Sequence, residues 1–170
     1  MLTKDEITEL RSAIGKLNWL NRTRPDLSYD VCELATNLKI ATVEHLIQAN
    51  KVIRKAKQNE VRLYFPKLDL NDIKVRVFTD ASYGNLPDGG SQGGIYIELC
   101  SGYKSCPIDW ESKRLRRTPK STLAAETIAM VEGVESAFLI NNLLEEILYN
   151  GNAKPQPIQV VTDNFSISFL

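Results

Sequence analysis

The 170-residue sequence predicts an α/β fold in which a small helical bundle precedes a mixed β-sheet. In the first third of the chain apolar residues recur every three or four positions, whereas from residue 61 they alternate with polar ones. A long helical pattern over 122–148 then separates three alternating segments from one last apolar strand. This order predicts three antiparallel strands, a crossover helix and a parallel fourth strand. We therefore expect a helical part over 1–60 and a sheet part over 61–170.

Three short helices are predicted in the helical part. Residues 5–20 have an apolar face spaced by three and four residues, and Thr3 is placed to cap it. Pro25 ends this pattern because it restricts the preceding residue to extended geometry, and Ser28 can cap a second helix that runs to about residue 41. A third helix over 43–58 completes a compact bundle.

Strands are predicted where the apolar period becomes two. A first alternating stretch is VRLYF (61–65). The three strands of the meander are IKVRVFT (73–79) and, after a loop rich in glycine and proline, GGIYIELC (93–100) and KSCPIDWES (104–112). The short loops between the later stretches indicate an antiparallel meander.

The long helix over 122–148 follows, and Gly133 is expected to bend it. Its apolar residues fall at helical spacing: Ala124, Ile128, Val131, Val134 and Phe138. A last strand, IQVVT (158–162), ends at Asp163, and residues 164–170 begin another helical pattern. Because that pattern has no terminating residue, we expect the sheet part to be incomplete at its C-terminus.

Composition narrows the possible chemistry. The formal net charge is zero, and the chain has neither a long apolar run nor a signal-peptide pattern, so we expect an intracellular protein without a membrane partner. Residues 1–120 carry 20 of the 21 lysines and arginines, which leaves the last third acidic. With His45 as the only histidine and three cysteines without metal-site spacing, a zinc site or a histidine-based triad fits poorly. Any catalytic or metal-binding site in this chain must therefore be built from carboxylates.

Three acidic residues form the candidate site: Asp80, Glu126 and Asp163. In the predicted topology the two aspartates end adjacent parallel strands, and the start of the long helix can overhang the same edge. Converging carboxylates repel one another unless a cation is present, and an all-oxygen ligand set favours Mg2+ or Mn2+. Spacing alone leaves other roles open: a turn residue for Asp80, a helix cap for Asp163 and a solvated acid for Glu126.

Several motifs, taken in order, resemble a known family. The upstream stretches LRSAIGKLNWLNRTRPDLSYDV and EHLIQANKVIRKAKQNEVRLYF resemble the thumb and connection that end the reverse transcriptase of copia-type LTR retrotransposon Pol polyproteins. The ribonuclease H domain that follows in those polyproteins is resembled by four further stretches: FTDASYGN, GSQGGIYIEL, PIDWESKRLRRTPKSTLAAETIAMVEG and VVTDN.

The resemblance implies a ribonuclease H-like fold and an endonuclease that hydrolyses the RNA strand of an RNA/DNA hybrid with two Mg2+ ions. Asp80 matches the family's first catalytic, metal-binding acid, Glu126 the helical glutamate and Asp163 the second aspartate. The family's fourth carboxylate lies on a later helix, beyond Leu170. A non-catalytic nucleic-acid-binding or structural remnant with the same fold is the alternative.

The same resemblance implies partners and a setting: an RNA/DNA hybrid, the rest of the reverse transcriptase polyprotein, and the cytoplasm within a virus-like particle. A basic cluster between the third strand and the long helix fits a nucleic-acid substrate, because several cations there can neutralise phosphates. A solvated charged loop is the other interpretation. The cluster consists of Lys113, Arg114, Arg116, Arg117 and Lys120.

Overall fold

The computed structural model describes residues 2–150 and 157–163, and the chain forms two compact units. The helical unit is Met1–Arg62 and the sheet unit is Leu63–Leu170. The helix expected over 164–170 lies outside the described residues.

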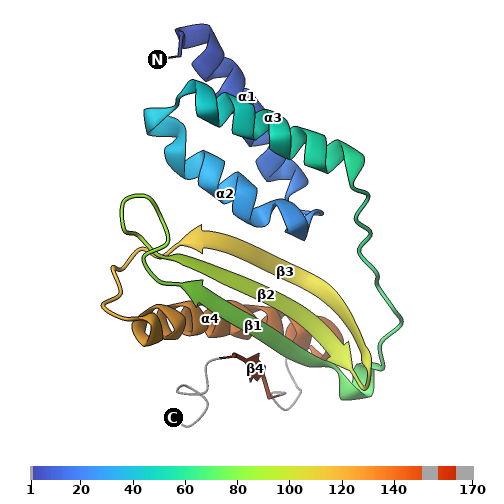
Figure 1. Ribbon diagram of the computed structural model, residues 1–170. Helices are drawn as coiled ribbons and strands as arrows, with labels where there is room; N and C mark the ends of the chain where they lie inside the picture. Colours follow the sequence, from blue (N-terminus) through green and yellow to red (C-terminus); the bar gives the residue numbers. More distant parts are fainter. Residues whose placement is uncertain (1, 151–156, 164–170) are drawn as a thin grey trace. The chain divides into compact units, whose positions relative to one another are not determined.

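The helical unit consists of three helices that enclose one apolar core (Figure 1). The helices are α1 (Lys4–Leu20), α2 (Ser28–Thr36) and α3 (Val43–Gln58), with short 3-10 turns at Pro25–Leu27 and Asn37–Ile40. The predicted apolar face of α1 is confirmed, because its buried residues have the expected spacing of three and four: Leu10, Ile14 and Leu17. Leu27, Val31, Leu34, Ala49 and Val52 complete the core.

The helix ends follow the prediction in one case and depart from it in another. Thr3 caps α1 in a reciprocal capping box with Glu6, as expected. The predicted cap at Ser28 is wrong, because the 3-10 turn at Pro25–Leu27 runs directly into α2 and leaves Ser28 as its first helical residue. The second helix is also shorter than predicted, since the chain tightens into a 3-10 turn after Thr36.

The sheet unit is a four-stranded mixed sheet with one long helix on one face (Figure 1). The strand order is β3-β2-β1-β4; β2 is antiparallel to both β1 and β3, whereas β4 is parallel to β1. This confirms the predicted α/β topology. The elements are β1 (Lys74–Ser82), β2 (Gln92–Ser101), β3 (Lys104–Arg114), α4 (Thr122–Tyr149) and β4 (Gln159–Val161), and a 3-10 turn at Leu70–Asp72 precedes β1.

The strand predicted at VRLYF is absent: residues 61–65 have no regular secondary structure. Val61, Tyr64 and Phe65 are exposed, with 62% of Phe65 accessible. Alternation over five residues is a weak strand pattern when no neighbouring strand pairs with it, and Pro66 removes the next backbone donor. The strand predicted over 61–65 was therefore wrong, because the prediction rested on alternation alone and no strand among the described residues is available to pair with this stretch.

The face of α4 that contacts the sheet also differs from the predicted one. Val131 and Phe138 are 52% and 56% exposed, whereas the buried positions recur every four residues at Ala125, Ala129, Gly133 and Ala137. These small residues let the helix approach the sheet closely. The helix continues through Gly133, where an added Cβ would lie 2.5 Å from Cγ2 of Thr79, so this glycine serves close packing.

α4 has 28 residues, which is long enough to suggest a membrane span. Nevertheless, no helix in the described part of the chain combines the length and the apolar character that crossing a bilayer requires.

Candidate metal centre

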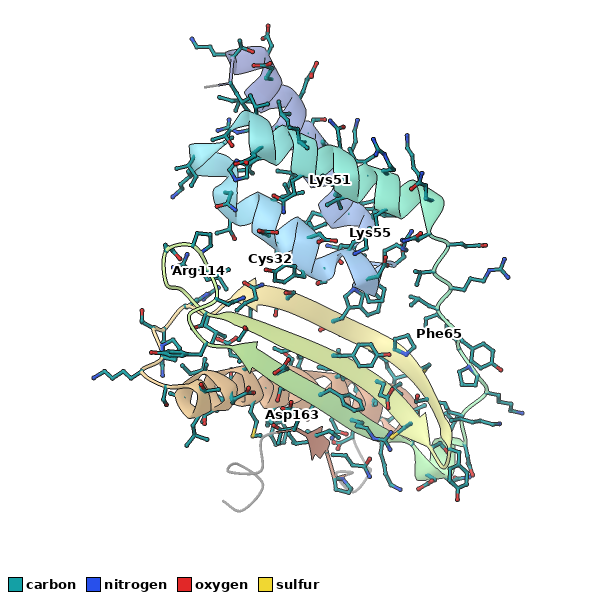
Figure 2. All side chains as sticks on the ribbon, viewed as in Figure 1. Cys32, Lys51, Lys55, Phe65, Arg114 and Asp163 are labelled. Carbon is teal, nitrogen blue, oxygen red and sulfur yellow. The ribbon has the colours of Figure 1, made fainter. Side chains whose placement is uncertain are left out.

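Two aspartates meet at one edge of the sheet because β1 and β4 are parallel neighbours. In their register Phe78 pairs with Val161. Asp80 and Asp163 each lie two residues beyond that pair, so they reach the same level on adjacent strands. Both are exposed, and Figure 2 shows Asp163 beside the end of β4.

Glu126 comes to the same place from the helix. Ser121 caps α4 by accepting a hydrogen bond from the Ala124 amide, which sets where the helix begins. The buried Ala125 and Ala129 then hold the start of the helix against the sheet. As a result one oxygen each from Asp80, Glu126 and Asp163 lies within 4.8 Å of the other two, while Glu126 itself is only 6% exposed.

The electrostatic environment of Glu126 disfavours its charge. Burial raises the pKa of this carboxyl, the negative charges of Asp80 and Asp163 raise it further, and only a hydrogen bond from the Ala81 backbone acts in the opposite direction. Oε2 of Glu126 is buried and has no hydrogen-bond partner among the residues that the structure describes. Such an oxygen is costly to keep unless something binds it.

This arrangement fits a hard divalent cation. All the donors are carboxylate oxygens, which suit Mg2+ and Mn2+, and the unpartnered Oε2 offers a ligand atom. Oxygens that bind one Mg2+ at about 2.1 Å lie no more than about 4.2 Å apart, so the oxygens would have to lie slightly closer than the 4.8 Å limit within which they are found. A cation held by these three residues would relieve their mutual repulsion and would provide a partner for Oε2 of Glu126.

Comparison with known proteins finds similarity to retrotransposon polyproteins over most of this chain. Two Arabidopsis thaliana proteins, the retrovirus-related Pol polyproteins from transposons RE1 and RE2, are each 29% identical over 164 residues, which is 96% of this chain. The putative transposon Ty5-1 protein of Saccharomyces cerevisiae is 30% identical over 131 residues, or 76% of the chain. The chain is a distant homologue of copia-type retrotransposon Pol polyproteins.

The chain matches only a part of each of these proteins. It spans 11% of the length of the two plant polyproteins and 41% of the yeast protein. No family model and no solved structure matches it.

The predicted basic cluster divides into two groups in the structure. Nζ of Lys113 lies 2.6 Å from Glu111 and 3.2 Å from Glu132, and Arg114 forms an ion pair with Asp88. The other three cations are exposed and have no ion pair among the described residues: Arg116, Arg117 and Lys120.

The contacts of Lys113 and Arg114 are structural features that the sequence prediction missed. Lys113 links β3 to α4 through its ion pair with Glu132, and Arg114 links the end of β3 to the β1–β2 loop through Asp88. Residues two apart in a strand share a face, so the Glu111–Lys113 pair could have been predicted. The pairs with Glu132 and Asp88 could not, because they depend on tertiary packing.

Proposed function

We propose that this chain carries the ribonuclease H of a retrotransposon Pol polyprotein, an endonuclease that hydrolyses the RNA strand of an RNA/DNA hybrid. In this proposal Asp80, Glu126 and Asp163 hold Mg2+ or Mn2+. The observation that carries it is the convergence of these carboxylates around a buried glutamate oxygen that has no hydrogen-bond partner. The homology to Pol polyproteins supports it independently.

The sheet topology also supports the proposal. Three antiparallel strands, a helix and a parallel strand next to β1 form the order expected of a ribonuclease H-like fold from the sequence resemblance. On that resemblance alone, residues 1–60 are assigned to the reverse transcriptase thumb and connection. On the same resemblance we propose that the protein acts in the cytoplasm within a virus-like particle.

Each part of the site has a distinct task in this reaction. Asp80, Glu126 and Asp163 would hold the divalent ions, and ions bound there would neutralise charge at the scissile phosphate and activate water. Glu126 is fixed by the helix and shielded from solvent, whereas Asp80 and Asp163 stand on the exposed side, where a nucleic acid can approach. The three free cations after β3 can neutralise phosphates on either side of the cleavage site. Recognition through phosphates and 2′-hydroxyls makes the expected selectivity largely independent of sequence.

The test is cleavage of a labelled RNA/DNA hybrid by the chain in the presence of Mg2+ or Mn2+. We expect Asp80→Asn to lower the cleavage rate by about 1,000-fold or more, because the rate depends on electrostatic stabilisation by the bound metal. Hybrid binding, measured by fluorescence anisotropy, should change little. Asp109→Asn, an exposed carboxylate in β3, is the matched control and should cleave normally.

Two results would contradict the proposal. Equal cleavage by Asp80→Asn and the wild-type chain would show that Asp80 is not a metal ligand. A wild-type chain that binds the hybrid but does not cleave it with either cation would favour the non-catalytic nucleic-acid-binding alternative.

A further inference from the structure

Gly133 lies where α4 approaches β1 closely, in the interior of the sheet unit. A Cβ atom added to it would lie 2.5 Å from Cγ2 of Thr79 and 3.2 Å from Cγ2 of Val77. Both strand residues are buried, and both are branched at Cβ, which restricts the rotation of their methyl groups. An alanine side chain at this position would therefore require α4 or β1 to move.

Both sides of this contact carry a residue of the candidate metal centre. Asp80 follows Thr79 directly in β1, and Glu126 lies seven residues before Gly133 in α4. Seven residues are about two helical turns, so Glu126 and Gly133 lie on the same side of the helix, about 10 Å apart along its axis. A hydrogen bond from the Ala81 backbone also joins Glu126 to β1. If β1 yields to an added methyl group, Asp80 is displaced; if α4 yields, Glu126 is displaced.

The packing of α4 on both sides of Gly133 limits how far such a shift can be absorbed locally. Ala129 lies one turn before Gly133 and Ala137 one turn after it, and both are buried in the cores that α4 forms with the strands. Close-packed protein interiors have low compressibility and transmit strain. We therefore expect a displacement at Gly133 to reach the first turns of the helix, where Glu126 lies.

We propose that Gly133 is a positioning residue for the candidate metal centre: its missing side chain sets how closely α4 lies to β1, and thereby how closely the oxygens of Glu126 and Asp80 approach each other. This inference rests on the proposed binding of Mg2+ or Mn2+ by these acids.

The spacing of the carboxylates matters most for a small cation. Mg2+ demands near-octahedral ligands at about 2.1 Å, whereas Ca2+ accepts flexible coordination at about 2.3–2.6 Å. One oxygen from each of the three acids lies within 4.8 Å of the other two, which leaves little room for further separation around Mg2+. A wider centre should therefore lose affinity for Mg2+ before it loses affinity for Ca2+.

The test compares the binding of Mg2+ and of Ca2+ to the wild-type chain and to Gly133→Ala by isothermal titration calorimetry. We expect the substitution to weaken Mg2+ binding about tenfold or more, the loss typical when a residue that supports metal ligands is changed. Ca2+ binding should weaken by less than about threefold, because Ca2+ tolerates looser geometry. The ratio of the two affinities is the decisive readout, since general damage to the fold would weaken the binding of both ions alike.

Gly15→Ala is the matched control. Gly15 also lies within a helix, α1, but an added Cβ there would have no atom of the described chain within 4 Å. Alanine is a better helix former than glycine, so both substitutions favour the helical conformation to a similar degree. Gly15→Ala should leave the affinities for both cations unchanged.

A second substitution locates the effect at the contact with Thr79. Thr79→Ser removes Cγ2 and keeps the hydroxyl group, which makes room for the added Cβ. Gly133→Ala combined with Thr79→Ser should therefore bind Mg2+ within about threefold of Thr79→Ser alone. If Gly133→Ala folds only when a cation is present, the concentration of each cation that restores its helical circular dichroism provides the same comparison, with Ca2+ acting at lower concentration than Mg2+.

Three outcomes would overturn the role of Gly133 and leave the metal centre in place. These are an unchanged ratio of Mg2+ to Ca2+ affinity in Gly133→Ala, a loss of Mg2+ affinity that Thr79→Ser does not relieve, and a Gly133→Ala chain that neither cation restores to its fold. A wild-type chain that binds neither cation would remove the metal centre itself and this inference with it. A chain that binds cations but does not cleave an RNA/DNA hybrid would contradict the proposed ribonuclease and not the positioning role.

Discussion

The helical unit and the sheet unit surround an acidic side chain in opposite ways: Asp26 is partly buried beside a cation, whereas Glu126 is buried beside other acids. In the helical unit Arg24, which is 8% exposed, holds Asp26 through two hydrogen bonds of 2.8 and 2.9 Å. In the sheet unit Glu126 faces two other carboxylates. The guanidinium lowers the pKa of Asp26, whereas burial and the neighbouring charges raise that of Glu126.

The carboxylates of Asp26 and Glu126 have opposite surroundings, which indicates that they serve different purposes. Arg24 also donates to the backbone carbonyl of Ala56, and Lys55 donates to Asp30 and to the Asp26 carbonyl, so these ions link α3 to the start of α2. Their charges are balanced within the chain and serve to hold it together. The charges of the candidate metal centre are not balanced by a cation among the described residues, which costs stability and would be relieved by a cation from outside.

Removal of Arg24 should have the largest effect on stability. Arg24→Ala leaves Asp26 and the Ala56 carbonyl without their donor, and we expect the helical unit to lose about 3 kcal/mol. Hydrogen exchange followed by mass spectrometry reports each unit separately. Arg22→Ala is the control: Arg22 is exposed over the Trp19 ring at 5.0 Å, and its loss should cost less than about 1 kcal/mol. Equal effects of the two substitutions would show that the buried pair is not structural.

Removal of the Glu126 charge should act in the other direction. Without divalent cations, Glu126→Gln should stabilise the sheet unit by about 1 kcal/mol, because it relieves carboxylate repulsion and a buried charge. With Mg2+ at 100 times its dissociation constant, the wild-type chain should gain about 2.7 kcal/mol and the variant much less. Thermal unfolding with and without Mg2+ measures both. A variant that is less stable than the wild type without metal would mean that Glu126 is held by unrecognised contacts.

The smallest expected effect is on the pH dependence of the two units. Because the pKa of Asp26 is lowered on folding, its contribution is present above its unfolded value near 3.8 and is lost as pH falls through the folded one. For Glu126 the folded pKa is raised, so its contribution is complete below 4.5 and is lost as pH rises through the folded value.

Between pH 7 and pH 5, metal-free chain should therefore gain protection in the sheet unit near Glu126 and change little in the helical unit. Hydrogen exchange corrected for intrinsic rates measures this. A loss of protection near Glu126 between pH 7 and pH 5 would contradict a raised pKa of this carboxyl.

Much of the topology was predictable because it depends on local period and connection length. The crossover helix required β4 to lie parallel to β1, and from that pairing the meeting of Asp80 with Asp163 followed. The face of α4 was not predictable in the same way. Larger residues such as Val131 and Phe138 gave the stronger apolar pattern, but alanines fit closer to the sheet, and sequence spacing does not measure that distance. The ion pairs of Lys113 and Arg114 likewise depend on which loop and helix lie beside β3.

The short strand β4 links the stability of the sheet edge to cation binding. It pairs with β1 over only three residues, all of them exposed, and Asp163 follows two residues after the last of these pairs. Within the described residues β4 is a short strand at the edge of the sheet, so it is expected to separate from the sheet at a lower free energy than β1 or β2. Since Asp163 leaves the centre whenever β4 leaves the sheet, cation affinity and strand docking are thermodynamically linked. A bound cation would thus fasten the edge of the sheet, and any contact that secures β4 would tighten cation binding by the same factor.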